Sequence, residues 1–401
     1  MEQKIEIVQM KEELYDASIA LSQFAFQYVR SPEEIERTKQ QFLAEPAVKW
    51  AAIVDGQLAA QAAVFDLYTY IGGNRFAMGG VAGVATWPEY RRQGLVAKLL
   101  VHALEGMKDR GQSISFLHPF AFAFYRKFGW ETYIEYKSYT IRTDQLPARQ
   151  LINGRIKRVV MEASANVIGQ LYEAYASKYN GTLARSELWW EYRVNKRKPG
   201  QTAVYYDTAD KPQGYIRYEV KNSQMTIHEL VYLNEEARSS LWSFIAQHDS
   251  MIERVTITAP SDDLLPFLLD NPRIQQETIP YFMARIVDAA AFVEQYSFES
   301  ADYEDHIVIA IKDEHAPWNN GLYMLNIAES GKANLVPYEY CASNNGQNSV
   351  ELSIGTLTTI LLGYMNILQL YQYGRVQGVE SIINRLQERI PERNTYLMDF
   401  F

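Results

Sequence analysis

The apolar and polar positions of the first 145 residues predict a mixed α/β unit. Apolar side chains recur every three or four positions between residues 95 and 107, which predicts an amphipathic helix ended by Gly111. Ser31, Pro32 and Glu34 predict a capped helix start. Strand-like runs cover residues 4–8, 48–54, 57–70, 75–86, 113–120 and 130–142. The predicted order is β, α, α, a three-strand meander, α, β, α, β.

The same order recurs in residues 146–287 with different residues, which predicts a second copy of one architecture. Its expected helices include residues 235–247 and 261–270. From residue 288 the pattern changes to hairpin strands and a late helix at 376–390. The predicted fold is therefore α/β (α+β) in three parts, covering residues 1–145, 146–287 and 288–401.

Composition narrows the possible partners. The 401 residues contain 39 Lys and Arg against 48 Asp and Glu, a net charge of -9, which disfavours nucleic acid and anionic membranes and favours a cationic ligand. Cys341 is the only cysteine, so no disulfide framework is expected. The acidic start does not resemble a secretory signal, and these features favour the cytoplasm.

Residues 352–374 carry no charge and are long enough to span a bilayer. Polar side chains such as Thr358, Thr359 and Asn366 interrupt the run, so buried helices of a globular domain are the better prediction.

Most common catalytic motifs are missing. The six histidines lack HxxxH or HExxH spacing, and no GxSxG, Walker loop or GxGxxG motif follows a strand. We therefore expect no metal site.

The segment "VAGVATWPEYRRQGLVAKLLVHAL" carries the clearest chemistry. A predicted strand ends at Thr86, and Arg91, Arg92 and Gly94 lead directly into the amphipathic helix. The unpaired N–H groups and positive dipole at a helix N-terminus suit a pyrophosphate, which the two arginines would neutralise. The alternative is a solvated basic helix start without a ligand.

At these residues the chain resembles the GCN5-related N-acetyltransferases, whose loop has the form Gln/Arg-x-x-Gly-x-Gly/Ala. "RRQGLV" matches at Arg91 and Gly94 and has Val96 where a small residue is usual. The segments "VATWPEYRRQGL" and "FAFYRKFGW" and the C-terminal Phe401 are similar to the enhanced intracellular survival (Eis) type. That resemblance covers the whole chain and implies two tandem acetyltransferase folds followed by a sterol-carrier-like domain.

The resemblance also implies a site for acetyl-coenzyme A (acetyl-CoA). Tyr125 would be the general acid that protonates the departing thiolate, and the α-carboxylate of Phe401 would be the general base. Phe120 and Ala121 would border the acetyl-CoA cleft. The strand and loop residues that would hold pantetheine and pyrophosphate are Val84, Ala85, Thr86, Arg91, Arg92, Gln93, Gly94, Leu95, Val96 and Ala97.

The second copy has Glu235 and Glu236 at the matching helix start and no glycine. Two carboxylates there would repel a pyrophosphate, so one active site per chain is expected.

The leading hypothesis is acetyl transfer to a primary amine of a cationic small molecule, such as an aminoglycoside or a polyamine. A non-catalytic protein that senses acetyl-CoA or binds lipid, and a protein lysine acetyltransferase, remain alternatives. The resemblance implies a homo-oligomer, a hexamer built from dimers.

Overall fold

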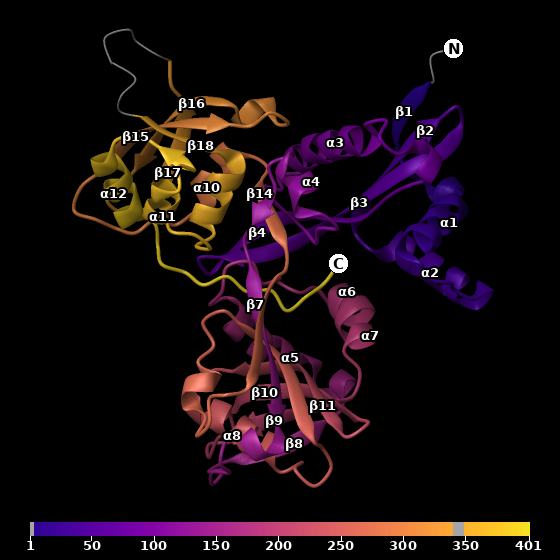
Figure 1. Ribbon diagram of the computed structural model, residues 1–401, viewed down its shortest axis with the longest axis vertical. Helices are drawn as coiled ribbons and strands as arrows, with labels where there is room; N and C mark the ends of the chain where they lie inside the picture. The colour runs from indigo at the N-terminus through magenta and orange to yellow at the C-terminus, as the bar shows by residue number, and fades with distance from the viewer. Residues whose placement is uncertain (1–3, 340–348) are drawn as a thin grey trace.

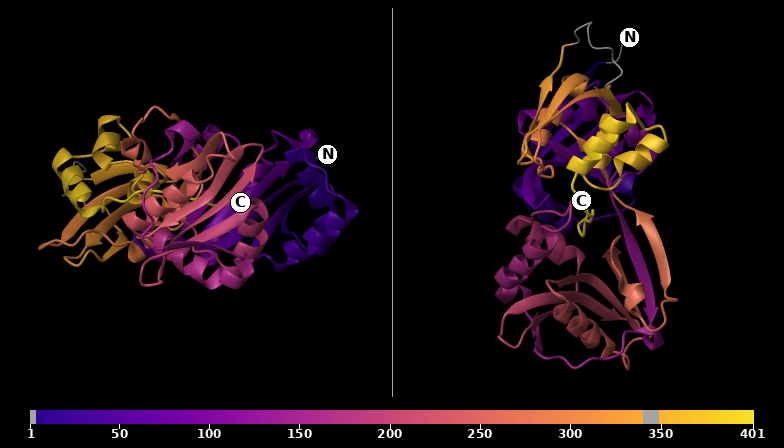
Figure 2. Two further views of the ribbon diagram at one scale, coloured as in Figure 1. Left: turned by 90° about the horizontal axis from the view of Figure 1, so that it is seen from below. Right: turned by 90° about the vertical axis from the view of Figure 1, so that its left-hand side faces the viewer.

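The computed structural model describes residues 4–339 and 349–401, and Cys341 lies outside the described residues. Three sheets form three lobes, and the C-terminal segment crosses between the first two lobes (Figures 1 and 2). The predicted mixed α/β class is confirmed.

The first sheet has seven strands with helices on both faces. Helix α3 (Leu95–Asp109) lies on one face, and α1 (Tyr15–Phe26) and α2 (Pro32–Ala44) lie on the other (Figure 1). The strands in spatial order are β1 (Ile5–Gln9), β2 (Ala47–Val54), β3 (Gln57–Ile71), β4 (Asn74–Thr86), β5 (Ile114–Leu117), β14 (Met283–Ile286) and β6 (Glu131–Thr132).

Local signals predicted two of these helices well. Ser31 accepts a hydrogen bond from the Glu34 backbone N–H at 3.2 Å, and its own N–H donates to the Glu34 carboxylate at 2.9 Å. This reciprocal pair is the predicted capping box of α2, with Pro32 as the first helical residue. The apolar positions of α3 are buried along one side, as their spacing indicates.

The second sheet repeats the order of a meander followed by a parallel strand. Helices α5 (Met161–Ala176) and α8 (Glu235–Ala246) pack against it, and α6 (Glu187–Trp189) and α7 (Asn195–Arg197) face the first lobe. Its strands in spatial order are β13 (Gln275–Pro280), β7 (Glu135–Arg142), β12 (Arg254–Pro260), β11 (Gln224–Tyr232), β10 (Pro212–Lys221), β9 (Gln201–Tyr206) and β8 (Arg155–Val159).

Two strands are exchanged between the copies. The run at 130–142 splits into β6, which stays in the first sheet, and β7, which pairs with β12 and β13 in the second. Strand β14 returns from the second copy to pair with β5 and β6. The sequence analysis expected each of these segments to close its own copy. Figure 1 shows β7 descending from the first lobe into the second.

One predicted helix is wrong. Residues 261–270 contain only a 3₁₀ turn, Leu265–Leu268. Pro266 removes a backbone donor and clashes with a preceding carbonyl, so a longer helix cannot form there.

The third lobe is a five-stranded sheet covered by helices. The uncharged segment 352–374 contains α10 (Ile354–Leu361), which is buried along its whole length, and α11 (Ile367–Gln372). Across residues 4–339 and 349–401, no helix has both the length and the apolar character needed to cross a membrane. The other elements are α9 (Ala289–Gln295), β15 (Asp305–Lys312), β16 (Gly321–Ile327), β17 (Ala333–Pro337), β18 (Ser349–Ser353), β19 (Val376–Gln377) and α12 (Glu380–Arg389).

Candidate active site

A cavity of about 1150 Å³ opens where β4 and β5 separate. The two strands pair in parallel only from Met78 to Val81 on β4, and β4 continues to Thr86 paired with β3 but not with β5. The predicted residues that line this cavity are Val84, Ala85, Thr86, Arg91, Arg92, Gly94, Leu95, Val96, Ala97, Phe120, Tyr125 and Phe401. Gln93 and Ala121 lie beside lining residues but are not part of the wall.

The N-terminus of α3 forms one end of the cavity. Gly94 is the residue before the helix, has φ of 76° and carries no side chain that could cap the first turn. A Cβ at Gly94 would meet no atom within 4 Å, so space is open above the turn. The first residues of α3, Leu95 to Ala97, line the cavity together with Arg91 and Arg92. The unpaired N–H groups of the first helical turn therefore lie at its wall, which fits a pyrophosphate.

A β-bulge shapes the strand wall. Ala85 pairs with Gln61 and Ala82 pairs with Ala63, so Gly83 and Val84 together face a single residue of β3. A bulge interrupts the ladder and frees backbone groups for a ligand. The Thr86 hydroxyl is buried without a hydrogen-bond partner among the described residues, so it too can bind a ligand.

Two adjacent glycines show how the faces of the sheet differ. A Cβ at Gly79 would lie 2.1 Å from the Met107 sulfur of α3, while a Cβ at Gly80 would lie 2.9 Å from the Phe401 ring. Successive residues of a strand point to opposite faces. Phe401 therefore lies on the face of the sheet opposite α3. The gap between β4 and β5 beyond Val81 connects the two faces of the sheet.

Tyr125 lies on α4 (Phe122–Arg126) and is only 3% exposed. Its ring is 5.2 Å from the rings of Phe120 and Phe124. Burial raises the pKa of Tyr125 above its usual value near 10. The phenol therefore stays protonated at neutral pH, as a proton donor must.

The C-terminal ring fills an aromatic pocket. Phe401 is 7% exposed, and its ring centroid is 4.9 Å from that of Phe282, 6.0 Å from Trp189 and 6.4 Å from Phe65. Arg197 donates to the Phe400 carbonyl at 2.6 Å. Among the described residues, the Phe401 carboxylate forms no ion pair.

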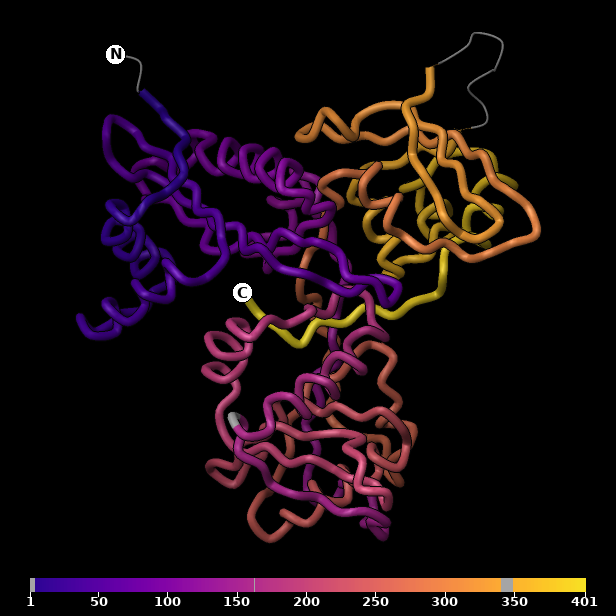
Figure 3. The backbone as a smooth tube through the Cα atoms, turned by 180° about the vertical axis from the view of Figure 1, so that it is seen from behind, coloured from indigo at the N-terminus to yellow at the C-terminus, as the bar shows by residue number. Residues whose placement is uncertain are grey.

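Asp399 anchors this tail in the second copy. Its carboxylate accepts hydrogen bonds from Arg185 Nε at 3.0 and 3.1 Å, from Trp189 Nε1 at 2.9 Å and from the Tyr172 hydroxyl at 3.3 Å. Arg185 also donates to Glu229 at 2.6 Å, and all three charged side chains are buried. Figure 3 shows the tail running between the first and second lobes.

Lys198 adds a second connection to the tail. It donates to Glu229 and, at 2.8 Å, to the Met398 carbonyl. Desolvation alone would raise the pKa of Glu229, but Arg185 and Lys198 hold it well below its usual range. Glu229 is therefore charged at neutral pH and fixes both cations that hold the tail.

The helix of the second copy that corresponds to α3 is closed to an anion. Asn234 caps α8 by accepting from the Ala237 N–H at 2.8 Å, and Glu235 pairs with Arg238 at 2.6 Å. The tail lies in this copy beside the end of β12, where the Tyr396 hydroxyl donates to the Thr258 carbonyl at 3.4 Å.

Sequence reasoning missed several residues of this site. Lys49 and Gln61 line the cavity from two strands, and Arg193 and Arg197 reach it from the second copy. Nothing in the local pattern marks these four. Asp399, by contrast, is a lone charge in "LMDFF", and a charge within an apolar tail needs a partner if the tail is buried.

Family models match all three parts of the chain. The description "Acetyltransferase (GNAT) domain" matches residues 6–133 and, through a second model, residues 181–286, and "Sterol carrier protein domain" matches residues 289–398. The chain belongs to the GCN5-related N-acetyltransferases. It has the Eis-type arrangement of a tandem GNAT fold followed by a sterol-carrier domain.

Curated relatives carry acetyltransferase names. An uncharacterized N-acetyltransferase of Streptomyces avermitilis is 24% identical over 390 residues and 90% of each chain. The N-acetyltransferase Eis of Mycobacterium tuberculosis is 23% identical over 320 residues and 76% of each chain. The chain is thus an acetyltransferase enzyme, and its GNAT domains indicate that it uses acetyl-CoA.

Solved structures agree on the fold. A probable N-acyltransferase of unknown function from Enterococcus faecalis has a TM-score of 0.92 at 29% identity, with all of both chains covered. Eis1 from Mycobacterium abscessus has a TM-score of 0.80 at 19% identity, again with both chains fully covered. Within the described residues of this GNAT enzyme, no group of three or more His, Cys, Asp and Glu side chains is arranged to hold a metal ion.

Proposed function

We propose that the enzyme transfers an acetyl group directly from acetyl-CoA to a primary amine, with Tyr125 as the general acid and the Phe401 carboxylate as the general base. The observation that supports this most is that one cavity is lined by the α3 N-terminus, by Tyr125 and by Phe401. These three groups come from distant parts of the chain, and their meeting in one cavity fits a single reaction centre.

The residues present fit the acetyl donor. The uncapped N–H groups of α3, Arg91 and Arg92 would hold the pyrophosphate, and the bulged strand at Val84 and Thr86 would hold the pantetheine arm. When bound, acetyl-CoA supplies an activated thioester carbonyl.

The proton transfers follow from the two faces of the sheet. The acceptor arrives from the side of Phe401, whose carboxylate takes the proton that the ammonium must lose before its nitrogen can attack. The C–N bond forms as the C–S bond breaks, and Tyr125 gives its proton to the departing sulfur. The nitrogen then loses its second proton, which restores the Tyr125 hydroxyl, and the proton on the Phe401 carboxylate leaves to solvent. Products are the acetamide and free coenzyme A.

The acetyl acceptor is expected to be a primary amine. A cationic amine such as a polyamine or an aminoglycoside is the leading hypothesis of the sequence analysis, and the net charge of -9 agrees with it in sign. The lipid-binding alternative has less support, because the cavity among the core residues of the sterol-carrier domain holds only about 10 Å³. A homo-oligomer and a cytoplasmic location stay predictions, and a protein lysine acetyltransferase stays an alternative.

The test measures coenzyme A release with a panel of primary amines, polyamines and aminoglycosides. Tyr125→Phe and deletion of Phe401 should each lower kcat by about 10²–10⁴-fold, the usual contribution of an acid or a base. Tyr68→Phe is the matched control, since Tyr68 is exposed and outside the cavity wall. Near wild-type rates in both folded variants would disprove the assigned roles.

A further inference from the structure

The acceptor side of the cavity is positively charged. Four basic side chains line it, Arg30, Lys49, Arg193 and Arg197, in addition to the two arginines near α3. Among the described residues of the wall, Glu45 is the only acidic side chain. The local charge is therefore opposite in sign to the net charge of the chain.

Glu45 is not free to bind a cation. Its two carboxylate oxygens accept from Arg193 Nε and Nη2 at 2.8 and 2.7 Å, and Gln41 donates a third hydrogen bond at 2.9 Å. This bidentate pair is partly buried and geometrically well matched. A polycation in the cavity would have only the Phe401 carboxylate to pair with, and that group is needed as the base.

Lys49 is a partly desolvated member of this set. Its ammonium lies 3.6 Å from the centroid of the Phe42 ring and donates to the Phe42 carbonyl. Burial lowers the pKa of Lys49 to about 8, with Arg193 adding to the effect and Glu45 opposing it. An anion bound beside Lys49 would offset this cost.

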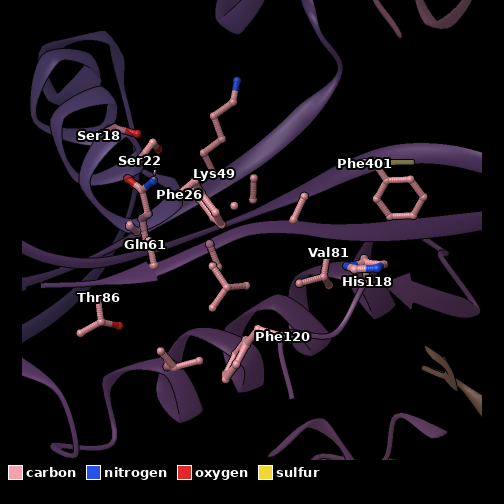
Figure 4. Close-up of a pocket in the computed structure, with 18 of the residues that line it drawn as sticks. Ser18, Ser22, Phe26, Lys49, Gln61, Val81, Thr86, His118, Phe120 and Phe401 are labelled. Carbon is pink, nitrogen blue, oxygen red and sulfur yellow. Dashed lines mark hydrogen bonds between the residues drawn. The ribbon is translucent and has the colours of Figure 1, made fainter. Parts of the chain in front are cut away.

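Gln61 adds an unused polar group on the same side. It is 5% exposed, and its Nε2 donates to the Ser22 hydroxyl at 2.8 Å (Figure 4). Its Oε1 is buried without a partner among the described residues. Buried hydrogen-bond acceptors nearly always have a donor. The unpaired Gln61 oxygen therefore indicates a ligand that donates an N–H or O–H.

We propose that the acceptor is a primary amine that also carries an anionic group, a carboxylate or a phosphate. The anion binds at Lys49 and Arg30, a donor of the acceptor satisfies Gln61, and the amine lies at the Phe401 carboxylate. This inference rests on the proposed acetyl transfer and specifies its substrate class.

The test uses three amines with one five-carbon chain: cadaverine, pentylamine and 5-aminopentanoate, whose far ends are cationic, neutral and anionic. We expect kcat/KM for 5-aminopentanoate to exceed that for pentylamine by at least about tenfold, the effect of one hydrogen bond to a charged group. Cadaverine should be the poorest. A parallel arm with 3-aminopropylphosphonate, compared with propylamine and 3-aminopropanoate, distinguishes a phosphate-like anion from a carboxylate.

Variants test the assigned residue. Lys49→Gln should reduce the ratio of 5-aminopentanoate to pentylamine toward one, and Lys49→Glu should reverse the preference toward cadaverine. Lys39→Gln is the control, because Lys39 pairs with Glu12 outside the cavity. Preference of the wild type for cadaverine, or an unchanged ratio in Lys49→Gln, would overturn the inference while leaving acetyl transfer intact. Absence of acetylation of any amine would instead overturn the proposed function.

Discussion

The docking of the C-terminal tail can be weakened at Asp399 without altering Phe401. Asparagine keeps the shape of the side chain and one carbonyl oxygen, but it removes the charge opposite Arg185. A hydrogen bond between charged groups contributes about 1.5–3 kcal/mol, and breaking a buried pair costs about 3–5 kcal/mol. Arg185 still pairs with Glu229 in this variant, so its charge stays partly compensated. We therefore take about 3 kcal/mol as the loss of docking free energy of the tail in Asp399→Asn. The undocked fraction of the tail should then rise about 10²-fold.

Removal of Phe401 by carboxypeptidase, followed by intact mass, measures this fraction. When redocking is fast, the cleavage rate follows the population of the open state. Asp399→Asn should therefore lose Phe401 about 100-fold faster than the wild type, and its kcat should fall. Asp302→Asn, at an exposed position, should change neither quantity. Wild-type cleavage and turnover rates in Asp399→Asn would refute the anchoring role.

Three further outcomes are expected. Gly80→Ala should push the Phe401 ring aside and lower kcat about tenfold or more. Gly169→Ala, whose Cβ meets no atom within 4 Å, should leave kcat unchanged, and equal kcat values in the two variants would contradict this prediction. Because burial raises the pKa of Tyr125, kcat should not fall between pH 7 and about 9.5. A loss with a midpoint below about pH 9 that is absent in Tyr125→Phe would contradict the raised pKa. Because the pKa of Lys49 is about 8, the preference for 5-aminopentanoate over pentylamine should decline as pH rises from about 7 to 9, and a constant ratio would contradict the proposed anion site.

Local sequence signals predicted the helix α3 that borders the cavity, together with its start. The spacing of apolar residues placed a helix over residues 95–107, and α3 spans Leu95–Asp109. Gly94 marks its start because a positive φ there favours glycine. These features depend on neighbours within one or two turns, so the chain itself encodes them.

The Phe401 side of the cavity depends on partners that are distant in sequence. The residue pattern of β7 is compatible with either sheet, because pairing partners are not encoded in a strand's own period. Arg193 lines the cavity because the segment Trp190–Val194, between α6 and α7, lies beside the first lobe. Lys49 lines it from β2, where it pairs with Ala63 of β3. No local sequence pattern predicts that Arg193 and Lys49 lie at the cavity.

The two copies use the same opening of the fold for different purposes. In the first, parallel pairing ends at Val81, and the bulged strand beyond it lines the cavity. In the second, parallel pairing of β11 ends at Ile227, also beside a bulge, and the next inward residue is Glu229, which holds Arg185 and through it the tail. The second copy needs no pyrophosphate loop if the opening between its strands serves to fix the C-terminus. We infer that the second copy places the Phe401 carboxylate, the proposed base, so that the second copy positions a group of the proposed reaction centre in the first.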